Sequence, residues 1–542
     1  MRYRTVMDVG TRPIRFLHRG RVVQATGLPP TTTVLTWLRE HAACTGTKEG
    51  CNEGDCGACT VAVAVRQPDG AVTLRNLNAC LLFMPALDGK ALFSVEDLTG
   101  LCSGQLHPVQ QALVDHHGSQ CGFCTPGFVM TMWTQWEAAQ HTGVVPSRQE
   151  WADALAGNLC RCTGYRPILD AAQACVSLPA ANGAIDRKAL SQALQALVPS
   201  PALEYAAHDP AQGEVRRFST PQSSDDLAAC LQAHPHARVL GGATDIALWT
   251  NKAHRDVGHL VYTGRAVDLT EVREHEGWMR IGGAVSLEVA WARLSHHWPT
   301  LHDVWRRFAS PPIRHAGTMA GNVANGSPIG DGPPVLMALG ARLVLRQGSR
   351  RRKVWLDAFY LGYQRKDLQP GEFIEWIEVP LPKPGQVLHA WKVSKRYDSD
   401  ISAVCAGFGL HFAADTHGQW TRGPSSKVGG TRLQGVTIAY GGLAATVQRA
   451  RAAEQALMQA GWTQDGIAAA QLALAQDFQP LTDLRATAAY RLEAARALLQ
   501  RLWWSLESAG SLVASNDSQS PAKAPGSVGM DPGAAMRVEV WR

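Results

Sequence analysis

The sequence predicts a multidomain α+β protein. Its 542 residues are enough for about three to five domains, because single hydrophobic cores stop growing beyond a few hundred residues. The hydrophobic pattern changes several times along the chain between the period of two typical of strands and the longer period typical of helices. Cysteines crowd into the first third of the chain, so this part differs from the rest in chemistry as well.

Two domains are predicted in the N-terminal part of the chain. Residues 12–97 alternate short apolar runs with turns, which predicts a small β-rich domain, and residues 33–43 predict one helix within it. Residues 98–180 predict a compact helical unit from their helical spacing of apolar residues. A capping box from Ser147 to Glu150 marks the start of one of its helices.

The remaining chain divides into a linker, two domains and a tail. Residues 181–213 are rich in Pro, Ala and Gly without a steady period, which predicts a linker. Strands and helices alternate over 214–386, with a long loop of Gly, Asn and Pro predicted at 316–334. Residues 387–506 read as strands followed by a long helix, and residues 507–542 as a loose tail.

Composition and charge argue against several functions. The hydrophobic share of 45% is ordinary for globular proteins. The net charge of +6 is modest and no dense basic stripe occurs, so nucleic-acid binding has little support; the run 350–353 is interpreted as a solvated turn. The N-terminus lacks the apolar core of a signal peptide, and no run of about 18 apolar residues occurs, so we expect a cytoplasmic chain without a membrane span.

The first cysteine group has the spacing of an iron–sulfur site. Cys51, Cys56 and Cys59 form C-x4-C-x2-C, and Cys80 follows, which is typical of plant-type [2Fe–2S] ferredoxins. Zinc is the alternative, but it usually takes paired C-x2-C groups, and only one half fits here. Cys44 breaks the spacing and is interpreted as a packing residue.

The loop around this group suits a cluster. A chain that curls around a cluster must aim backbone N–H groups at its sulfurs, and Gly50, Gly54 and Gly57 can supply the positive φ angles this needs. Disulfides are not expected, because the compartment is reducing and the 13 cysteines are an odd number.

A second cysteine group combines C-x2-C with C-x-C. Cys121 and Cys124 precede a predicted helix, whose N-terminus would favour a thiolate at Cys124, and Cys160 and Cys162 lie in a glycine-flanked turn. Zinc stays open for these residues alone, but a second cluster acting as an electron relay fits better beside the first. The cysteines without a partner pattern are interpreted as core thiols: Cys102, Cys175, Cys230 and Cys405.

The middle domain carries two stretches that suit a dinucleotide. Residues 239–248, VLGGATDIAL, predict a strand, a turn of small residues and a helix, and backbone N–H groups in such a turn can cradle a pyrophosphate. A plain strand–turn–helix is the equal alternative. The stretch 316–334 could approach a dinucleotide closely, and Asp331 could accept hydrogen bonds from it. Flavin is the expected cofactor, because it converts single electrons into hydride chemistry.

These motifs together resemble the molybdenum hydroxylase family. GCNEGDCGACT, QCGFCTPG, NLCRCTGYRP, GGATDIA, the SPIGD loop and KRYDSDISAV occur in the order that the family shows, over roughly residues 12–505. The resemblance is strongest to the iron–sulfur/FAD chains of bacterial members that oxidise xanthine. It implies a β-grasp ferredoxin-like domain, a four-helix-type [2Fe–2S] domain, an FAD-binding α+β domain of the PCMH/VAO type, and a C-terminal α+β flavoprotein domain.

The resemblance also implies cofactor ligands, and no catalytic residue beyond the flavin. The family's two [2Fe–2S] clusters carry over to Cys51, Cys56, Cys59 and Cys80 and to Cys121, Cys124, Cys160 and Cys162. Its FAD contacts carry over to Val239, Leu240, Gly241, Gly242, Ala243, Thr244, Asp245, Phe308, Thr318, Ala320, Gly321, Asn322, Asp331, Ile374 and Lys392.

The function implied by the resemblance is electron transfer in purine catabolism. A larger partner chain with a molybdopterin cofactor would take hypoxanthine and xanthine to urate, in an α₂β₂ assembly. Electrons would pass through the helical-domain cluster, the ferredoxin-like cluster and FAD to NAD⁺. The alternative substrates are aldehydes, nicotinate or carbon monoxide; the alternative of another class is a zinc-binding scaffold. O₂ stays open as acceptor, because the segment around Tyr397 and Ser399 lacks an Arg and an acidic residue of the vertebrate members.

Overall fold

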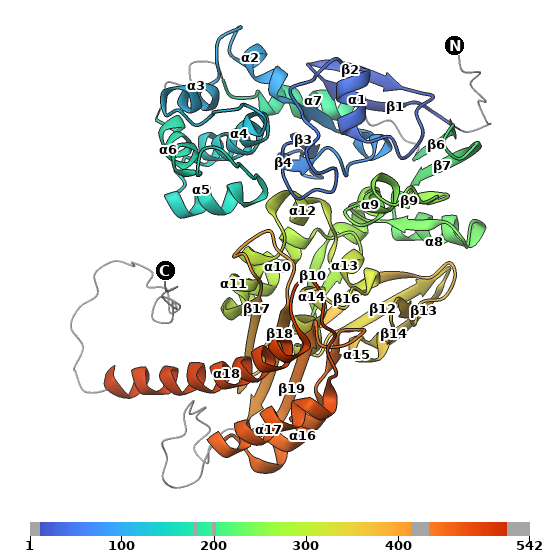
Figure 1. Cartoon of the computed structure of the whole chain (residues 1–542). Coiled ribbons are helices and arrows are strands. Elements are labelled where there is room, and N and C mark those ends of the chain that lie inside the picture. The colour runs from blue at the N-terminus through green and yellow to red at the C-terminus, as the bar shows by residue number, and fades with distance from the viewer. Residues whose placement is uncertain (1–10, 178–182, 198–201, 414–432, 517–542) are drawn as a thin grey trace.

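The computed structural model describes residues 11–177, 183–197, 202–413 and 433–516. It confirms the multidomain α+β class. Figure 1 shows the two N-terminal domains (blue and cyan) above the middle domain (green and yellow), with the C-terminal domain (orange and red) below. In the described ranges, none of the helices combines the length and the apolar character that crossing a bilayer requires.

The first domain is a mixed five-stranded sheet with one helix packed against it, the expected β-grasp arrangement. The strand order is β2-β1-β5-β3-β4, and β1 runs parallel to β5. Helix α1 begins after Thr33, whose side chain accepts a hydrogen bond from the Thr36 N–H, and it buries Leu35 and Leu38. The bounds are β1 Ile14–His18, β2 Arg21–Ala25, α1 Val34–Glu40, β3 Thr60–Arg66, β4 Val72–Asn78, η1 Met84–Leu87, β5 Ala91–Phe93 and η2 Val95–Asp97.

The second domain is helical, as predicted. The capping box of Ser147 and Glu150 is present at the start of α5. The core of this domain includes Ala62 of β3, and Phe93 of β5 packs against it, so the two N-terminal domains share apolar surface. The bounds are α2 Leu98–Leu101, α3 Pro108–Asp115, α4 Thr125–Thr142, α5 Arg148–Ala154, η3 Leu155–Gly157 and α6 Arg166–Cys175.

The predicted linker at 181–213 is wrong for its described part. Residues 187–197 form helix α7, Arg187–Leu197, which buries Leu194 and Leu197 against the first sheet. Strand β6, Leu203–Asp209, pairs with β7 of the middle domain. Leucines recur at helical spacing among the alanines and glutamines of α7 and form one apolar face, which was not predicted. Residues 181, 182 and 198–201 lie outside the described residues.

The middle domain contains two larger sheets and the two-stranded sheet β14-β15. One larger sheet has the order β6-β7-β9-β8 and the other β10-β11-β16-β12-β13. The strands are β7 Glu214–Thr220, β8 Arg238–Leu240, β9 Leu260–Tyr262, β10 Val272–His275, β11 Trp278–Gly282, β12 Arg342–Gln347, β13 Arg350–Trp355, β14 Tyr360–Gly362, β15 Arg365–Lys366 and β16 Phe373–Pro380. The helices are α8 Ser224–Ala233, α9 Ile246–Asn251, η4 Thr263–Arg265, η5 Val267–Thr270, α10 Leu287–His297, η6 Pro299–Leu301, α11 His302–Arg307, α12 Pro311–Ala316, α13 Met319–Asn325, α14 Gly332–Ala338 and α15 Leu356–Phe359.

The long loop predicted at 316–334 is wrong in most of its length. It holds all of α13 and the start of α14. Thr318 caps α13 through a hydrogen bond that its hydroxyl accepts from the Gly321 N–H, and proline occupies the first turn of α14. Glycine and proline therefore mark helix ends here.

The basic run 350–353, interpreted as a solvated turn, lies in strand β13. Its side chains reach carboxylates on or beside β16, with Arg351 2.6 Å from Glu375 and Lys353 3.2 Å from Glu378. Both glutamates are buried. A buried carboxylate needs a partner, and these pairs account for a basic strand at this position.

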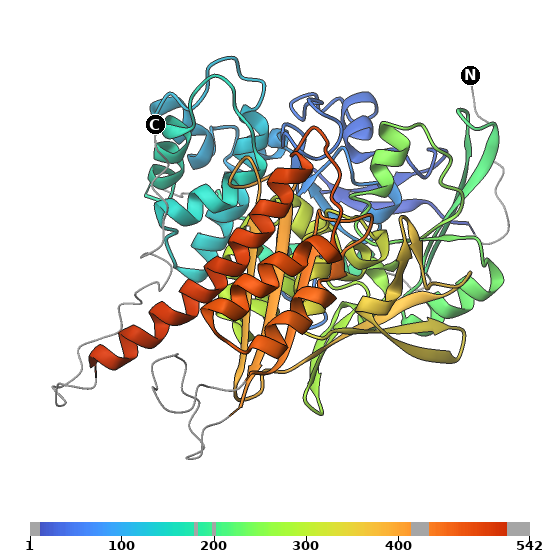
Figure 2. The same ribbon diagram turned by 60° about the horizontal axis from the view of Figure 1, so that its bottom comes forward.

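The C-terminal domain is a four-stranded sheet in the order β17-β18-β19-β20 with helices on one face. Figure 2 shows the red helices lying over the orange strands. The bounds are β17 Gln386–Val393, β18 Val404–Phe412, β19 Leu433–Gly441, β20 Gln448–Arg449, α16 Arg451–Ala460, α17 Gln464–Asp477 and α18 Ala488–Asn516. Because α18 continues to residue 516, the predicted loose tail is wrong for 507–516, and residues 517–542 lie outside the described residues.

Candidate functional site

The first cysteine group lies on the loop between α1 and β3 and on the turn after β4. The Sγ atoms of Cys59 and Cys80 lie 3.3 Å apart, and both residues are buried. Cys51 Sγ accepts hydrogen bonds from the backbone N–H groups of Cys56 at 3.3 Å and Glu53 at 3.5 Å. The Cys56 thiol also bonds Cys51 and lowers its pKa to about 4. The four predicted ligands therefore come together as two pairs.

The glycines of this loop have two different roles. Gly54 and Gly57 have φ angles of 82° and 68°, as predicted. The prediction is wrong for Gly50, which has no positive φ, but a Cβ added there would lie 2.8 Å from Cys56 Sγ. Gly50 is thus required by the close approach of a thiol. The outside residue Cys44 is buried with its Sγ 3.7 Å from His18 Nε2, and its interpretation as packing is confirmed.

The second cysteine group also forms two pairs. The thiols of Cys121 and Cys162 bond one another, as do those of Cys124 and Cys160. Cys124 is the N-cap residue of α4. The sequence predicted a thiolate at this position, but that prediction is wrong for the unbound cysteine, because burial raises the pKa of Cys124 to about 12. Binding to a metal would release that proton. Among the predicted core thiols, Cys175 and Cys405 are buried, while Cys102 and Cys230 are half-buried.

The paired arrangement fits a [2Fe–2S] cluster better than zinc. Four cysteine thiolates hold the two irons of such a cluster, so that two serve each iron. Structural zinc instead needs four ligands around one point. Backbone N–H groups already point at the sulfurs of both groups, as cluster sulfurs require.

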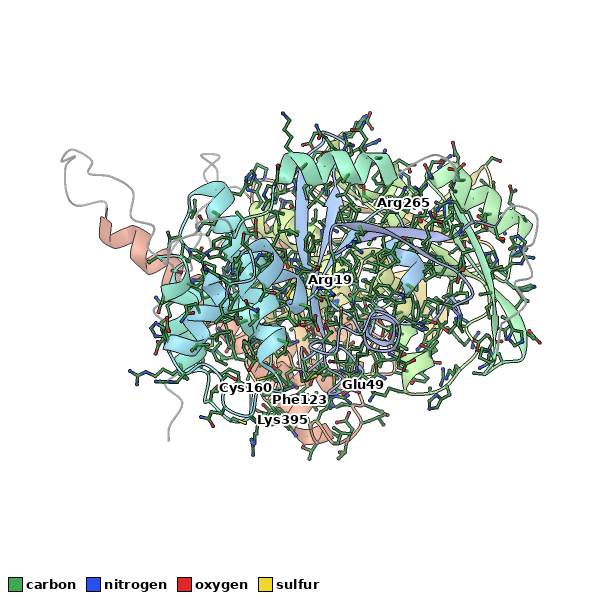
Figure 3. The ribbon with its side chains drawn as sticks, turned by 90° about the horizontal axis from the view of Figure 1, so that it is seen from above. Arg19, Glu49, Phe123, Cys160, Arg265 and Lys395 are labelled. Atoms are coloured by element: carbon green, nitrogen blue, oxygen red, sulfur yellow. The ribbon has the colours of Figure 1, made fainter. Side chains whose placement is uncertain are left out.

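The two cysteine loops contact one another directly. The carbonyl oxygen of Cys56 accepts a hydrogen bond from the Leu159 N–H at 3.0 Å, one residue before Cys160. The buried side chain of Asn158, which sequence reasoning missed, donates to the Gly57 carbonyl at 3.1 Å. The Phe123 ring of the second group's loop lies 3.5 Å from the position of a Cβ added at Gly50 of the first loop. Figure 3 labels Phe123 with Cys160 and Glu49. The interface between the domains thus runs through the predicted ligand loops.

The two predicted FAD stretches of the middle domain lie against each other. Strand β8 ends in the turn 241–245, and Ala243 in that turn has a φ of 62°. A Cβ added at Gly242 would lie 1.8 Å from the Ala316 carbonyl oxygen, and one at Gly241 would lie 2.8 Å from Thr318 Oγ1. The turn and the start of α13 therefore approach closely enough to require glycine. Asn325 of α13 also donates to Asp245 at 3.0 Å.

A group of polar residues lies beside these stretches. The Oδ1 atom of Asn322 is buried without a hydrogen-bond partner in the described protein. A buried acceptor of this kind fits a bound ligand that carries donors. Asp331 is buried and accepts from Lys392 Nζ at 2.7 Å and from Ser402 Oγ at 2.5 Å. Three of the predicted FAD contacts are thus brought to one region, with Asp331 and Lys392 paired to each other.

The apolar members of the predicted FAD set belong to one core. Phe308, Ala320 and Ile374 are buried in the same hydrophobic cluster. The Phe308 ring packs against Trp291 with 5.6 Å between ring centres, and its carbonyl accepts from Arg314 Nη1 at 2.9 Å. Ala320 belongs to α13, so this core packs against the helix that meets the turn 241–245.

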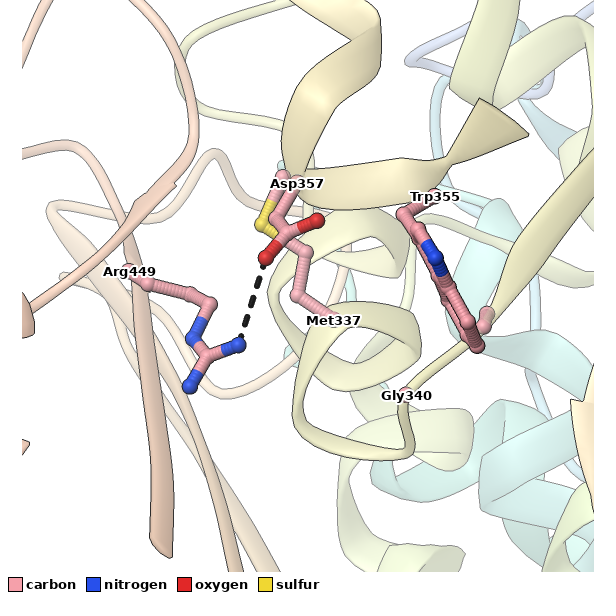
Figure 4. A pocket seen from close by; sticks show the side chains of 6 residues that line it. Met337, Gly340, Trp355, Asp357 and Arg449 are labelled. Carbon is pink, nitrogen blue, oxygen red and sulfur yellow. Dashed lines mark hydrogen bonds and ion pairs between the residues drawn. The ribbon is translucent and has the colours of Figure 1, made fainter.

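A separate cavity of about 330 Å³ lies between the middle and C-terminal domains. Asp357 and Arg449 face each other across it at 3.2 Å, as Figure 4 shows. Its lining contains none of the predicted site residues: Met337, Gly340, Ala341, Trp355, Asp357 and Arg449.

Comparison with known families agrees with this layout. Residues 94–173 match a family described as [2Fe–2S] binding domain. Residues 213–382 match the FAD binding domain in molybdopterin dehydrogenase, and residues 389–506 match the CO dehydrogenase flavoprotein C-terminal domain. This chain carries the iron–sulfur and FAD domains of the molybdenum hydroxylase family. The predicted resemblance is therefore confirmed at the level of the family.

Two curated relatives have related sequences. The chain is 33% identical over 488 residues to xanthine dehydrogenase of Drosophila pseudoobscura pseudoobscura. This match covers 80% of this chain and 35% of the relative. It is 30% identical over 472 residues to xanthine dehydrogenase/oxidase of Mus musculus, which covers 79% of this chain and 34% of the relative. The molybdenum hydroxylase chain thus spans about a third of the length of these relatives.

Two solved structures match about half of the chain. Reconstituted CO dehydrogenase from Oligotropha carboxidovorans matches 52% of this chain and 94% of its own, with 24% identity and a TM-score of 0.47. Quinoline 2-oxidoreductase from Pseudomonas putida 86 matches 54% of this chain and 97% of its own, with 21% identity and a TM-score of 0.47.

Proposed function

We propose that this chain is the cytoplasmic electron-transfer subunit of a xanthine dehydrogenase. Electrons from a molybdopterin cofactor on a larger partner chain, in an α₂β₂ assembly, would pass through two [2Fe–2S] clusters and FAD to NAD⁺. One observation carries the proposal: hydrogen bonds join the second cysteine loop to the first, and the first to the domain of the FAD turn. Leu159 bonds Cys56 at 3.0 Å, and Asn251 bonds Cys80 at 2.8 Å.

Burial supports the order of the two centres. Two cysteines of the second centre are exposed, Cys121 and Cys162, while Cys124 is half-buried and Cys160 is buried. None of the first centre is exposed: Cys59 and Cys80 are buried, and Cys51 and Cys56 are half-buried. An exposed centre suits electron entry from a partner chain. A buried centre between that entry and the FAD domain suits an internal relay, because exclusion of water and hydrogen bonds to the sulfurs tune the potential of a cluster.

The residues present fit FAD in the middle domain. When bound, FAD would supply the conversion between single electrons and hydride transfer. The turn 241–245 would hold the pyrophosphate through backbone N–H groups, and Asn322 Oδ1 would accept from the cofactor. We assign no general acid or base for substrate hydroxylation to this chain. Its role is to hold the cofactors near one another and to keep water from the buried first centre.

Xanthine and NAD⁺ are the proposed substrate and acceptor. The similarity to the xanthine dehydrogenases of Drosophila and mouse supports the substrate. For the acceptor, the Arg307 guanidinium lies 5.0 Å from the Tyr397 ring centre and directly precedes Phe308. This cation also lies 3.5 Å from the Asp303 carboxylate, and a dinucleotide phosphate that reached it would meet the guanidinium beside the Tyr397 ring.

The first test is the metal content and colour of the purified chain. We expect visible absorption from flavin and iron–sulfur centres, with iron and acid-labile sulfide enough for two [2Fe–2S] clusters. A colourless protein containing zinc would contradict the proposal and support the scaffold alternative.

The second test separates the two centres. Cys160→Ser should remove one of two EPR-distinct clusters and stop substrate-dependent NAD⁺ reduction by the complex with the partner chain. Cys175→Ser, at a buried cysteine outside both groups, is the matched control and should keep both signals. Survival of both clusters in Cys160→Ser would show that the ligand assignment is wrong.

The third test addresses the substrate and the acceptor. The complex with the partner chain should reduce NAD⁺ with xanthine faster than with aldehydes or nicotinate. It should use O₂ more slowly than NAD⁺. Preference for another substrate would leave the electron-transfer role standing and reject xanthine.

A further inference from the structure

Two side chains of the middle domain donate hydrogen bonds to backbone carbonyl groups of the first cysteine group. Asn251 Nδ2 donates to the Cys80 carbonyl oxygen at 2.8 Å, and Lys252 Nζ donates to the Cys51 carbonyl oxygen at 2.5 Å. Cys51 pairs with Cys56, and Cys80 pairs with Cys59. One donor therefore reaches each thiol pair, and both donors come from the end of a single short helix, α9.

The same end of α9 also holds the tip of the cysteine loop. Asn251 Nδ2 lies 3.2 Å from Asn52 Oδ1, and Asn52 is a non-glycine residue with a φ of 56°. Lys252 Nζ lies 3.8 Å from the Glu53 carboxylate. A residue in the left-handed region needs support from its surroundings, and here another domain supplies it.

The other end of α9 belongs to the predicted FAD turn. Asp245, the last residue of that turn, is the N-cap of the helix. An α-helix rises 1.5 Å per residue, so α9 separates its two ends by roughly 9 Å. One rigid turn-and-a-half of helix therefore connects the turn predicted to hold FAD with the carbonyl groups of two cysteines in the first centre.

We propose that Asn251 and Lys252 are positioning residues that fix the first iron–sulfur centre relative to FAD and raise its reduction potential. The inference rests on the proposed function, because it requires a [2Fe–2S] cluster at Cys51, Cys56, Cys59 and Cys80. Asn251 fixes the loop, and Lys252 adds a positive charge beside the centre.

The direction of the effect follows from charge. A one-electron reduction adds one negative charge to the cluster, and a nearby ammonium group stabilises the more negative form. Removing Lys252 therefore destabilises the reduced cluster and lowers its potential. The lysine side chain is 46% exposed, so salt should weaken its effect. Hydrogen bonds and net charge near a cluster are known to tune such potentials.

The test is an EPR-monitored redox titration of the purified full-length chain. In Lys252→Met, the ratio of reduced to oxidised first cluster at the wild-type midpoint should fall roughly three- to tenfold. The second cluster should keep its midpoint, and Lys252→Arg should restore the first. Asn251→Ala should broaden or shift the EPR signal of the first cluster and also lower its midpoint potential, because the Cys80 carbonyl and Asn52 lose the donor that fixes them.

Lys48→Met is the matched control. Lys48 lies on the same loop but donates to the Gly46 carbonyl oxygen at 3.2 Å, which is not a cysteine carbonyl. An equal shift in Lys48→Met would overturn the proposal, because the effect would then belong to the general field of the loop. Unchanged first-cluster potentials in both Asn251→Ala and Lys252→Met would also overturn it. A wild-type chain without a first-cluster signal would instead reject the proposed function. If Asn251→Ala loses its iron, the potential of Lys252→Met decides.

Discussion

Glu137 shows how a single residue depends on its environment. It lies on α4, is buried, and accepts a hydrogen bond from the Ile185 N–H at 2.9 Å. Arg187 of α7 lies 3.8 Å from its carboxylate. Removal from water nevertheless dominates and raises the pKa of Glu137 from 4.5 to about 7. This carboxyl therefore links the helical domain to α7 in a form that holds its proton near neutral pH.

Glu137 should make stability depend on pH. The folded-state pKa of about 7 lies above the ordinary 4.5, so the folded chain holds a proton that the unfolded chain has lost. The stabilisation is complete below pH 4.5 and is lost as the pH rises through 7, by up to about 3 kcal/mol. Glu137→Gln should raise the midpoint of thermal unfolding at pH 8 and flatten its dependence over pH 5–8.

The control for this prediction is Glu493→Gln, whose side chain is 73% exposed. It should leave the pH dependence unchanged. An unchanged slope in Glu137→Gln would show that the carboxyl ionises at its ordinary pH in the folded chain.

At the scale of elements, the turn 241–245 and the start of α13 form one unit. The turn approaches the backbone before α13 so closely that Gly242 has no room for a side chain. Asn325, at the end of α13, donates to Asp245 at the end of the turn. The unit is held at two points, so a shift in either element should disturb the predicted FAD contacts on both.

Gly242→Ala should therefore lower the FAD content of the purified chain. The added Cβ would lie 1.8 Å from the Ala316 carbonyl oxygen, and a backbone atom cannot move aside without displacing α13. We expect at least a tenfold weaker FAD affinity, measured by flavin fluorescence after dilution, with the iron content of the protein retained. Gly100→Ala, where the added Cβ meets nothing within 4 Å, is the control. Full FAD occupancy in Gly242→Ala would contradict the assigned turn.

At the scale of the whole molecule, the domain interfaces pass through the cysteine loops. Asn158 accepts from the Thr131 hydroxyl at 2.7 Å and donates to Gly57 and Thr60 of the first domain at 3.1 Å each. The residue is 3% exposed. Because the junction is buried, its polar groups depend on one another for hydrogen bonds. The relative position of the two centres therefore rests on a few such contacts.

Asn158→Leu should weaken this junction. It removes three buried hydrogen bonds, one from the Thr131 hydroxyl and one each to Gly57 and Thr60, at a cost of about 2–4 kcal/mol. The midpoint of thermal unfolding of the two N-terminal domains should fall by roughly 5–10 °C. The EPR spin–spin interaction between the clusters should also change. Thr142→Ala, which removes an exposed hydroxyl within α4, should do neither. Unaltered spin coupling in Asn158→Leu would mean that the other contacts suffice to fix the two centres.

Local patterns in the sequence predicted the elements on which the site is built. The cysteine spacings predicted two separate groups, and each comes together in the structure as two pairs. Ser147 predicted the start of α5, because a capping box depends on residues only three positions apart. The turn 241–245 was predicted for the same reason, since small residues between a strand and a helix act locally.

The predictions failed where distant residues decided the outcome. The basic run at 350–353 read as a solvated turn because its charges, taken alone, prefer water; buried Glu375 and Glu378, which meet it across the sheet, make it a strand. Helix α7 was missed because its apolar face, with Leu194 and Leu197, is buried by the first sheet, whose residues lie far away in the chain. Gly50 was assigned a backbone role, whereas the thiol of Cys56 leaves it no room for a side chain.

The sequence by itself determined which residues bear the chemistry: eight cysteines in two spaced groups and a glycine turn that suits a dinucleotide. These are short-range properties, because ligand type, spacing and turn conformation act within a few residues. Only the tertiary structure decided which cysteines pair, which centre is exposed, and that Asn251 and Asn158 join the domains at the cysteine loops. Those contacts depend on packing between segments far apart in the chain, and no local pattern carries that information.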